Sequence, residues 1–592
     1  MISMNSRLGR AVQRFASQPG VTPGQVDQLR RALVADRSLA NRFNEAASSG
    51  LIKDFAVEPQ SESIPAGRLD AGSGTLRLPA STLRASGTEP SSDLQSVVRV
   101  QGMIVQLAAT KSDNTGSDSN ASFSRIRNLQ AAINQSPVLA QEIKRAATTP
   151  DPADPTHYSL ENFAILPPGA GAGGTYVGAT HTMNLLETSL TIAPHPPGVR
   201  DRQLRELTFT IGHEVRHSFN HGTTTSAWKD FNSEVTSISQ PLSPVHDYTD
   251  ALRDHLQVAR TDEAQANIAG WNALLSRERS LDPQFDIKNM PLILGRANDF
   301  LEVKASGETI PRQGMSFNCD GSLTETRQNV EAMAVHYFDR PSPNYVRPGV
   351  GDRQLGLGSS HVLDYKNYYL KEPIETIASA EQGAPLFQGR HPELTINAAS
   401  LGLKGDLLER EGLNLGGRTG SVPYFDSSQL PSAPRSFQSH SDASATGEGA
   451  QQRPIEGSLR GDRADVATKN PLVQELRNML PAGTSADRIS QIALAAKEGG
   501  VEAGRIRGID LVGEKLMLTG LTTGSHACVD LASPPPPAAQ SDMQFSAIVE
   551  QQQRQTRHAV QPYQGPTMSL NYERSRRWTF QAEPSTRALA VS

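Results

Sequence analysis

The sequence predicts a multidomain protein of the α+β class. Helix-spaced apolar residues alternate along the chain with short segments that have the pattern strand, glycine turn, strand. A stretch rich in Ser, Pro and Gly follows residue 425 and separates a long body from a compact C-terminal part. Of the 592 residues, 37% are hydrophobic, which is enough for several packed cores, while 48 Gly and 39 Pro indicate much loop and linker.

The composition excludes some classes of function. The formal net charge is −5, and a protein that binds phosphate backbones needs clustered Lys and Arg, so we expect no nucleic-acid partner. Cys319 and Cys528 form neither a disulfide framework nor a CxxC metal pair, which indicates folding in a reducing cytoplasm. No apolar run has the form of a secretory signal or reaches the roughly 18 residues of a membrane helix, so we expect no membrane span.

A unit of the N-terminal region is repeated. Residues 26–49 and 125–149 match at an offset of 100, with apolar residues at the same helix-spaced positions. Both segments are predicted to form a helical hairpin, and each is followed by a predicted strand–turn–strand segment, over 66–83 and 173–190. We infer two copies of a unit of roughly 80–90 residues. The first copy is expected to end near residue 95.

The second copy leads directly into the segment TFTIGHEVRHSFNHG. Residues 202–220 have the apolar spacing of a helix, with Gly222 as its expected stop. On this helix His213 and His217 are one turn apart on the same face, so both imidazoles can reach one ion. Glu214 lies beside the first of them, where it can take a proton from a water molecule without binding the metal itself.

A zinc site needs a third protein ligand and one open position. His221 continues the i, i+4 series, but it lies two turns from His213, so we interpret it as a polar residue at the helix end. Residues 247–279 have the pattern of one long helix, and Glu263 interrupts its apolar stripe. A buried carboxylate without a partner is costly, and a metal ion supplies that partner. Glu234 is the alternative third ligand.

The order HExxH, then a second helix with a glutamate and a polar residue four positions later, resembles the gluzincin family of zinc peptidases. The resemblance covers residues 155–280 and implies a mainly helical, zincin-like peptidase with a small antiparallel sheet. It implies a bound Zn²⁺ that activates water for attack on a peptide bond. Carried over to this chain, it implies that the zinc ligands are His213, His217 and Glu263, with Glu214 as the general base.

The same resemblance assigns roles to further residues. Asn267 stands where the family has the aspartate that orients the first histidine, and as a neutral amide it implies a weaker contact. The two x positions of HExxH are usually uncharged, and Arg216, which occupies the second of them, departs from this. In such peptidases an extended strand beside the metal pairs with the substrate backbone, and residues 173–185 are in the right order to form it. A hairpin that only covers the helix is the alternative.

A Tyr or His usually stabilises the oxyanion in this family. The sequence does not choose among three candidates in the following region, which are His336, Tyr365 and Tyr369. We assign residues 280–400, which contain them, to the far lobe of the peptidase.

The segment after the linker has a regular order of elements. Helices are predicted over 470–480 and 484–500 and strands over 506–521 and 526–531, followed by the Gln-rich run VEQQQRQ. This order resembles the C-terminal conserved domain of Xanthomonadales type IV secretion effectors. The resemblance implies docking on the coupling ATPase of the secretion machine, and therefore export without a signal peptide. The short glutamine run and the residues after it depart from that family.

Together these features predict a zinc metallopeptidase toxin that is made in the cytoplasm and exported by type IV secretion into rival bacteria. It would act in the target periplasm on a protein or on peptidoglycan stem peptides, and a cognate immunity protein would protect the producer. The alternatives are a virulence peptidase acting on a eukaryotic host and a non-enzymatic secreted binding protein. The expected regions are a repeat unit (1–95), a peptidase domain with the second unit (96–425), a flexible linker (426–465), a secretion domain (466–556) and a disordered tail (557–592).

Overall fold

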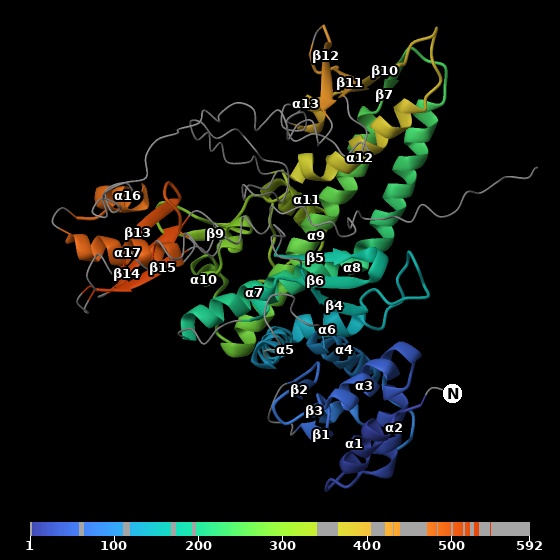
Figure 1. Ribbon diagram of the computed structural model, residues 1–592, viewed down its shortest axis with the longest axis vertical. Coiled ribbons are helices and arrows are strands. Elements are labelled where there is room, and N and C mark those ends of the chain that lie inside the picture. Colours follow the sequence, from blue (N-terminus) through green and yellow to red (C-terminus); the bar gives the residue numbers. More distant parts are fainter. Residues whose placement is uncertain are drawn as a thin grey trace, which may run out of the picture. The chain divides into compact units, whose positions relative to one another are not determined.

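The protein is a mixed α+β chain with small sheets and several cores, so the expected fold class is confirmed at that level (Figure 1). A computed structural model describes residues 3–58, 64–109, 119–166, 173–191, 197–339, 365–403, 421–429, 431–438, 471–481, 484–498, 501–512, 515–520, 526–531, 535, 541 and 545. The chain divides into two compact units, Met1–Pro454 and Ile455–Ser592. Within the described ranges, every helix is too short or too polar to cross a membrane.

The two N-terminal copies have the same topology. The first consists of α1 (Ser6–Ala16), α2 (Pro23–Leu33), α3 (Arg37–Ser49), β1 (Asp54–Glu58), β2 (Arg68–Asp70), β3 (Thr75–Pro79) and η1 (Ala80–Thr82). The second consists of α4 (Ser92–Ala109), α5 (Ser119–Asn134), α6 (Pro137–Ala146), β4 (Asn162–Ile165), β5 (Gly174–Val177), η2 (Gly178–Thr180), β6 (Thr182–Leu185) and α7 (Glu187–Leu190). The sheets have the orders β1-β3-β2 and β4-β6-β5, and in each the first pair is parallel and the second antiparallel.

The duplication predicted from the sequence is therefore also a duplication of fold, and the unit is larger than expected. Each helical hairpin is preceded by a further helix, α1 or α4, which packs on the parallel strand β1 or β4. The expectation of a purely antiparallel sheet is wrong, because β4 joins β6 in parallel. The boundary expected at residue 95 falls inside α4, and one hydrophobic cluster extends through both copies.

A pair of long helices forms the centre of the first unit. Helix α8 (Pro197–Ser239) and helix α9 (Thr249–Leu281) run side by side and are joined through the short strand β7 (Val245–Asp247) (Figure 1). Gly222 does not end α8 as expected. A Cβ at this position would lie 2.8 Å from Cβ of Pro152, so the glycine admits a neighbouring loop while the helix continues past it.

Two glycines let α8 and α9 cross closely. A Cβ on Gly212 of α8 would lie 2.7 Å from Cβ of Ala273, and a Cβ on Gly270 of α9 would lie 2.9 Å from Cε1 of Phe209. Real Cβ atoms almost never approach so closely, so the helix backbones could not meet here with larger residues. This crossing lies next to His213 and therefore controls the spacing of the motif from α9.

We expect Gly270→Ala to lower the free energy of unfolding by about 1–3 kcal/mol, because the added methyl group overpacks the crossing. Gly9→Ala is the matched control, since Gly9 lies in α1 and a Cβ there would have nothing within 4 Å. That control should be neutral or stabilising by up to about 1 kcal/mol, from helix propensity alone. Chemical denaturation of both variants measures the difference. Equal stabilisation by the two changes would contradict the close crossing.

Two further clusters pack on the helix pair. One lies between α9 and the segments η3 (Ile287–Asn289), α10 (Met290–Ile293), η4 (Gly295–Asp299), β8 (Leu301–Val303), β9 (Thr309–Pro311) and α11 (Arg327–His336). The other joins the distal ends of α8 and α9 to α12 (Tyr365–Gln382), β10 (Glu393–Ile396), α13 (Ala398–Leu401), β11 (Ser421–Asp426) and β12 (Ala433–Gln438). The four strands in the second cluster form a mixed sheet of order β12-β11-β10-β7.

This sheet corrects the expected flexible linker. The range 426–465 was expected to lack a packed structure, but β12 at its start pairs antiparallel with β11. Phe437 is 1% exposed, and its ring stacks on Tyr424 with centroids 4.0 Å apart. The Ser- and Pro-rich composition concealed a short strand whose aromatic residue completes a core. Residues 439–465 lie outside the described part of the chain.

The second unit has the predicted order of elements. Helices α16 (Pro471–Met479) and α17 (Ala486–Glu498) are followed by an antiparallel sheet of β13 (Ile506–Val512), β14 (Lys515–Gly520) and β15 (His526–Asp530). Leu476, Ile492 and Leu518 are fully buried in one core. The predicted helices and strands of this region are therefore confirmed. The Gln-rich run and residues 557–592 lie outside the described residues.

Candidate metal centre

Helices α8 and α9 bring three potential metal ligands together. Ligand atoms of His213, His217 and Glu263 all lie within 4.8 Å of one another. The two Nε2 atoms of the histidines are 3.0 Å apart, and Oε2 of Glu263 lies 3.4 Å from Nε2 of His213. His213 and His217 share one helix face because they are four residues apart, and Glu263 comes from the inward stripe of the facing helix. The predicted second stretch of chain thus converges on the motif.

The donor set fits a divalent cation. Oε2 of Glu263 and Nδ1 of His213 are buried and have no hydrogen-bond partner. A buried carboxylate oxygen without a partner is costly, and a cation between the three side chains would supply one. Two imidazole nitrogens and one carboxylate are the donor set of a three-ligand zinc site with one open position.

The charges of the group depend on one another. Burial alone would raise the pKa of Glu263, but His213, His217 and the Tyr369 hydroxyl together lower this pKa to about 2. Burial alone would lower the pKa of His217, but Asp262 and Glu263 raise it to about 10. Without a metal, the carboxylates therefore take their compensating charge from a protonated imidazole. The pocket is built for a positive charge at this point.

Glu214 lies beside the three ligands and next to the strand β5. It is 5% exposed, and burial raises its pKa from the ordinary value of 4.5, which the neighbouring histidines only partly oppose. A Cβ at Gly174, the first residue of β5, would lie 3.0 Å from Cγ of Glu214. β5 is an edge strand, since it pairs only with β6 in its three-stranded sheet. The strand expected to meet a substrate thus starts against the side chain expected to act as base.

A residue that the sequence analysis missed holds the second histidine. Oδ2 of Asp262 lies 2.9 Å from Nδ1 of His217, and its Oδ1 accepts a hydrogen bond of 2.7 Å from Asn220. A carboxylate on the outer nitrogen of a metal-binding histidine sets the ring's orientation and its tautomer. Asp262 immediately precedes Glu263, so the acidic pair in the stripe of α9 was a usable signal.

The orienting role expected for Asn267 differs in the structure. Asn267 is 1% exposed, but Nδ1 of His213, its expected partner, makes no hydrogen bond. Nδ2 of Asn267 is also buried without a partner. The carboxylate that orients a histidine is therefore that of Asp262, and the histidine is His217. Nδ1 of His213 has no such partner.

The three oxyanion candidates have different partners. The Tyr369 hydroxyl donates a hydrogen bond to Oε1 of Glu263, whereas the Tyr365 hydroxyl pairs with that of Tyr337. His336 faces elsewhere, with Nε2 2.8 Å from the carbonyl oxygen of Gln313. Only Tyr369 of the three contacts a ligand residue directly. The prediction for His336 is therefore not supported by its position.

Tyr368 is a further candidate that the sequence analysis did not select. Its side chain is 46% exposed, in contrast to the buried Tyr365. Its pKa is raised by desolvation first and then by the carboxylates of Glu263, Glu372 and Glu214. Tyr368 also precedes Tyr369, which hydrogen-bonds to Glu263. The adjacent tyrosines in the sequence could not show which one faces the site, because that depends on how α12 packs.

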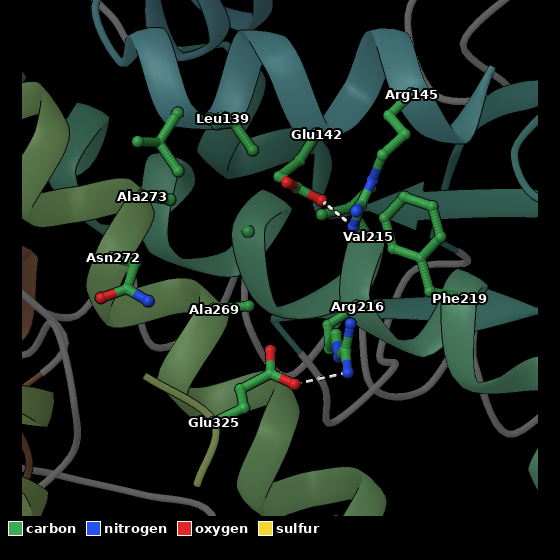
Figure 2. Close-up of a pocket in the computed structure, with 12 residues that line it drawn as sticks. Leu139, Glu142, Arg145, Val215, Arg216, Phe219, Ala269, Asn272, Ala273 and Glu325 are labelled. Atoms are coloured by element: carbon green, nitrogen blue, oxygen red, sulfur yellow. Dashed lines mark hydrogen bonds and ion pairs between the residues drawn. The ribbon is translucent and has the colours of Figure 1, made fainter. Parts of the chain in front are cut away.

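Arg216 points away from the ligands. It lines a separate pocket of about 110 Å³ and pairs with Glu325 at 2.5 Å (Figure 2). Neighbouring Arg145 lies over the ring of Phe219, with 4.1 Å from its guanidinium carbon to the ring centroid. Arg216 therefore belongs to a different face of α8 from the two histidines. It does not interfere with a cation at the ligand group.

The alternative third ligand is remote from the histidines. Glu234 lies 17 residues beyond His217 on the same continuous helix, which is about 25 Å along the axis at 1.5 Å per residue. Desolvation raises the pKa of Glu234, and the carboxylates of Asp254 and Asp250 raise it further. Of the two glutamates considered as the third ligand, Glu263 is the one that lies beside the histidines.

Comparison of the chain with protein families, with characterised proteins and with solved structures finds no match.

Proposed function

We propose that this protein is a zinc-dependent metallopeptidase. One observation carries the proposal: His213, His217 and Glu263 converge within 4.8 Å, with an unpartnered carboxylate oxygen among them. Glu214 lies beside this group, and an edge strand starts against it. These parts together suit the hydrolysis of an extended peptide.

The residues divide the chemistry among them. A bound Zn²⁺ would supply the Lewis acidity that polarises the scissile carbonyl and acidifies a water molecule. Glu214 takes the proton from that water and passes it to the leaving amine, for which its raised pKa suits it. Asp262 holds the ring of His217, and the hydroxyl of Tyr368 or Tyr369 donates to the developing oxyanion. The free edge of β5 hydrogen-bonds to the substrate backbone.

Removal of the metal tests the chemistry. The protein treated with a chelator is expected to lose cleavage of a casein or of a tetrapeptide stem from peptidoglycan, and one equivalent of Zn²⁺ is expected to restore it. Mg²⁺ should not, because it prefers oxygen ligands in octahedral geometry. Unchanged cleavage after chelation would contradict the proposal. A binding protein would show neither cleavage nor bound zinc in proportion to protein.

The position of β5 gives a prediction of its own. A Cβ at Gly174 would lie 2.7 Å from Cγ2 of Thr210 and 3.0 Å from Cγ of Glu214, so Gly174→Ala must displace the strand or the base. We expect kcat/KM to fall about 10–100-fold, because small misplacements of positioned groups cost rates of this order. Gly173→Ala is the control, since its Cβ would meet Arg296 at an ordinary 3.5 Å. Equal activity of the two variants would contradict the role of β5.

We further propose that the second unit is the export domain. Its helix–helix–three-strand order supports the resemblance to type IV secretion effectors. The coupling ATPase is then its partner, and the peptidase acts in the periplasm of rival bacteria unless a cognate immunity protein blocks it. Its substrate there is a protein or a peptidoglycan stem peptide.

Delivery and toxicity are tested separately. A chain that ends at residue 454 should keep its peptidase activity in solution and lose killing of neighbouring cells. The full chain directed to the periplasm by an added signal peptide should kill without a secretion machine. Killing of neighbours by the shortened chain would remove the export role. Harm to eukaryotic cells alone would favour a virulence peptidase.

A further inference from the structure

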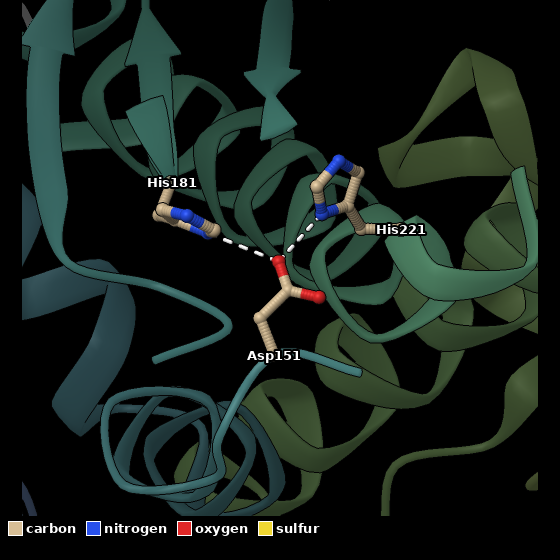
Figure 3. Close-up of side chains that lie close together, drawn as sticks. All are labelled: Asp151, His181 and His221. Atoms are coloured by element: carbon tan, nitrogen blue, oxygen red, sulfur yellow. Dashed lines mark hydrogen bonds and ion pairs between the residues drawn. The ribbon is translucent and has the colours of Figure 1, made fainter. Parts of the chain in front are cut away.

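A second group of metal-ligating side chains lies one helical turn beyond the first. Ligand atoms of Asp151, His181 and His221 all lie within 4.8 Å of one another (Figure 3). Oδ2 of Asp151 lies 2.5 Å from Nδ1 of His221 and 3.0 Å from Nδ1 of His181. Figure 3 shows both imidazoles directed at the same carboxylate oxygen from opposite sides. The interpretation of His221 as a residue at the helix end is therefore wrong.

Three separate elements contribute to this group. Asp151 belongs to the loop after α6, His181 joins η2 to β6, and His221 lies within α8. Two glycines make the approach possible. A Cβ at Gly178 would lie 2.1 Å from Nε2 of His221, and one at Gly222 would lie 2.8 Å from Pro152, in the loop of Asp151.

The group is buried and strained. Asp151 is 0% exposed and His181 is 4% exposed. The backbone of His181 has φ of +47°, a left-handed conformation that costs a non-glycine residue on the order of 1 kcal/mol or more. Nδ1 of His181 is buried and makes no hydrogen bond, although it lies close to Asp151. Packing alone does not account for a strained His181 whose buried Nδ1 faces a carboxylate without forming a hydrogen bond.

The carboxylate of Asp151 has neutral or titratable neighbours. Its Oδ1 accepts a hydrogen bond of 2.8 Å from the backbone amide of Ala153, and Oδ2 faces the two imidazoles. No arginine or lysine in the described ranges forms an ion pair with it. A buried carboxylate needs such compensation, and a cation bound between the three side chains would provide it.

We propose that Asp151, His181 and His221 form a second zinc site, distinct from the group around His213. Tetrahedral bonds of about 2.0–2.1 Å would separate the ligand atoms by about 3.3 Å. The two distances from Oδ2 of Asp151, which are 2.5 and 3.0 Å, would each need to open by less than about 1 Å. The fourth position would hold water. The site would fasten the connection between β5 and β6 to α8, one turn from His217. Only this last role depends on the proposed peptidase function.

The test counts metal ions in the full-length protein. Metal-free protein is dialysed against Zn²⁺ and its metal content is measured by mass spectrometry, for the wild type and two pairs of variants. Two ions are expected in the wild type, one after His217→Ala with Glu263→Gln, and one after His181→Gln with His221→Gln. None is expected when all four changes are combined. His391→Gln is the control, because His391 is exposed and belongs to none of the possible metal-binding groups among the described residues.

The number of zinc ions lost by each pair of variants shows which of the two proposed sites exists. One ion in the wild type that is lost with His217 and Glu263 but kept without His181 and His221 would overturn the second site and leave the proposed peptidase standing. The reverse pattern would remove the peptidase centre and keep the second site. Asp151→Asn guards against misfolding, because it preserves the size and shape of the side chain while it removes the charge and one acceptor oxygen. It should also leave one ion, with an unchanged circular dichroism spectrum.

Discussion

Glu214→Gln is expected to lower kcat/KM for peptide cleavage by about 10³–10⁴-fold, near the upper end of what a single general base contributes. The amide cannot accept the proton, but it keeps the size and position of the side chain. Zinc content should stay the same, because Glu214 is outside the group of three ligand residues. Steady-state kinetics on one peptide, with metal content measured on the same samples, tests this.

Glu234→Gln is the matched control for this change. It makes the same replacement on the same helix, about 25 Å further along the axis from His217. Its activity should equal that of the wild type. If Glu214→Gln and Glu234→Gln cleave at the same rate, or if Glu214→Gln kills target cells as well as the wild type, Glu214 is not the base.

Glu214→Gln should also be more stable than the wild type in the absence of metal. Burial raises the pKa of Glu214 in the folded state above its ordinary value of 4.5. Above pH 4.5 the unfolded chain ionises this group more readily than the folded chain does, so the side chain destabilises the fold there. Glu214→Gln removes that cost. Its melting temperature should exceed that of the wild type at pH 7, and the difference should vanish as the pH falls below 4.5.

Glu263→Gln is expected to cause the second large effect, a loss of zinc affinity. A neutral amide replaces the only carboxylate among the three ligands, and it leaves the dication without a charged partner. The loss should exceed the 10–100-fold decrease in affinity that is typical when only a residue supporting a ligand is changed. Competition with a chromophoric chelator measures the affinity, and cleavage should disappear at zinc concentrations that saturate the wild type.

Two companion variants make this result specific. Asp262→Asn should weaken zinc binding by about 10–100-fold, because Asp262 contacts Nδ1 of His217 at 2.9 Å without reaching the metal position. Asp254→Asn removes an exposed carboxylate from the same helix and should change nothing. If Asp262→Asn bound zinc less tightly than Glu263→Gln, the assignment of Glu263 as the third ligand would be wrong.

Two metal ions bound at neighbouring turns of α8 would place a catalytic site and a structural site on one helix. His213 and His217 would hold the first ion, and His221 would contribute to the second. β5 and the first residue of η2 run from Gly174, beside Glu214, to Gly178, beside His221. Anchoring the strand at its far end would keep its free edge parallel to the ligand group.

The sequence by itself determined the features that depend on local spacing. The four-residue interval put His213 and His217 on one face, and the apolar stripe of α9 put Glu263 inward, where it is 5% exposed. The repeated pattern also predicted both hairpins of the N-terminal copies. Such features follow from helix and strand periodicity, and any chain with this pattern would show them.

The tertiary structure alone decided which of these side chains meet. It paired Asp262 with His217, left Nδ1 of His213 without a hydrogen bond from Asn267, and directed Arg216 to Glu325. It carried α8 through Gly222 and brought His221 to Asp151, a residue 70 positions away. The physical reason is that contacts between elements depend on how closely two backbones approach. In this chain, glycines at the helix crossing and beside the loops set that approach, and no periodicity records it.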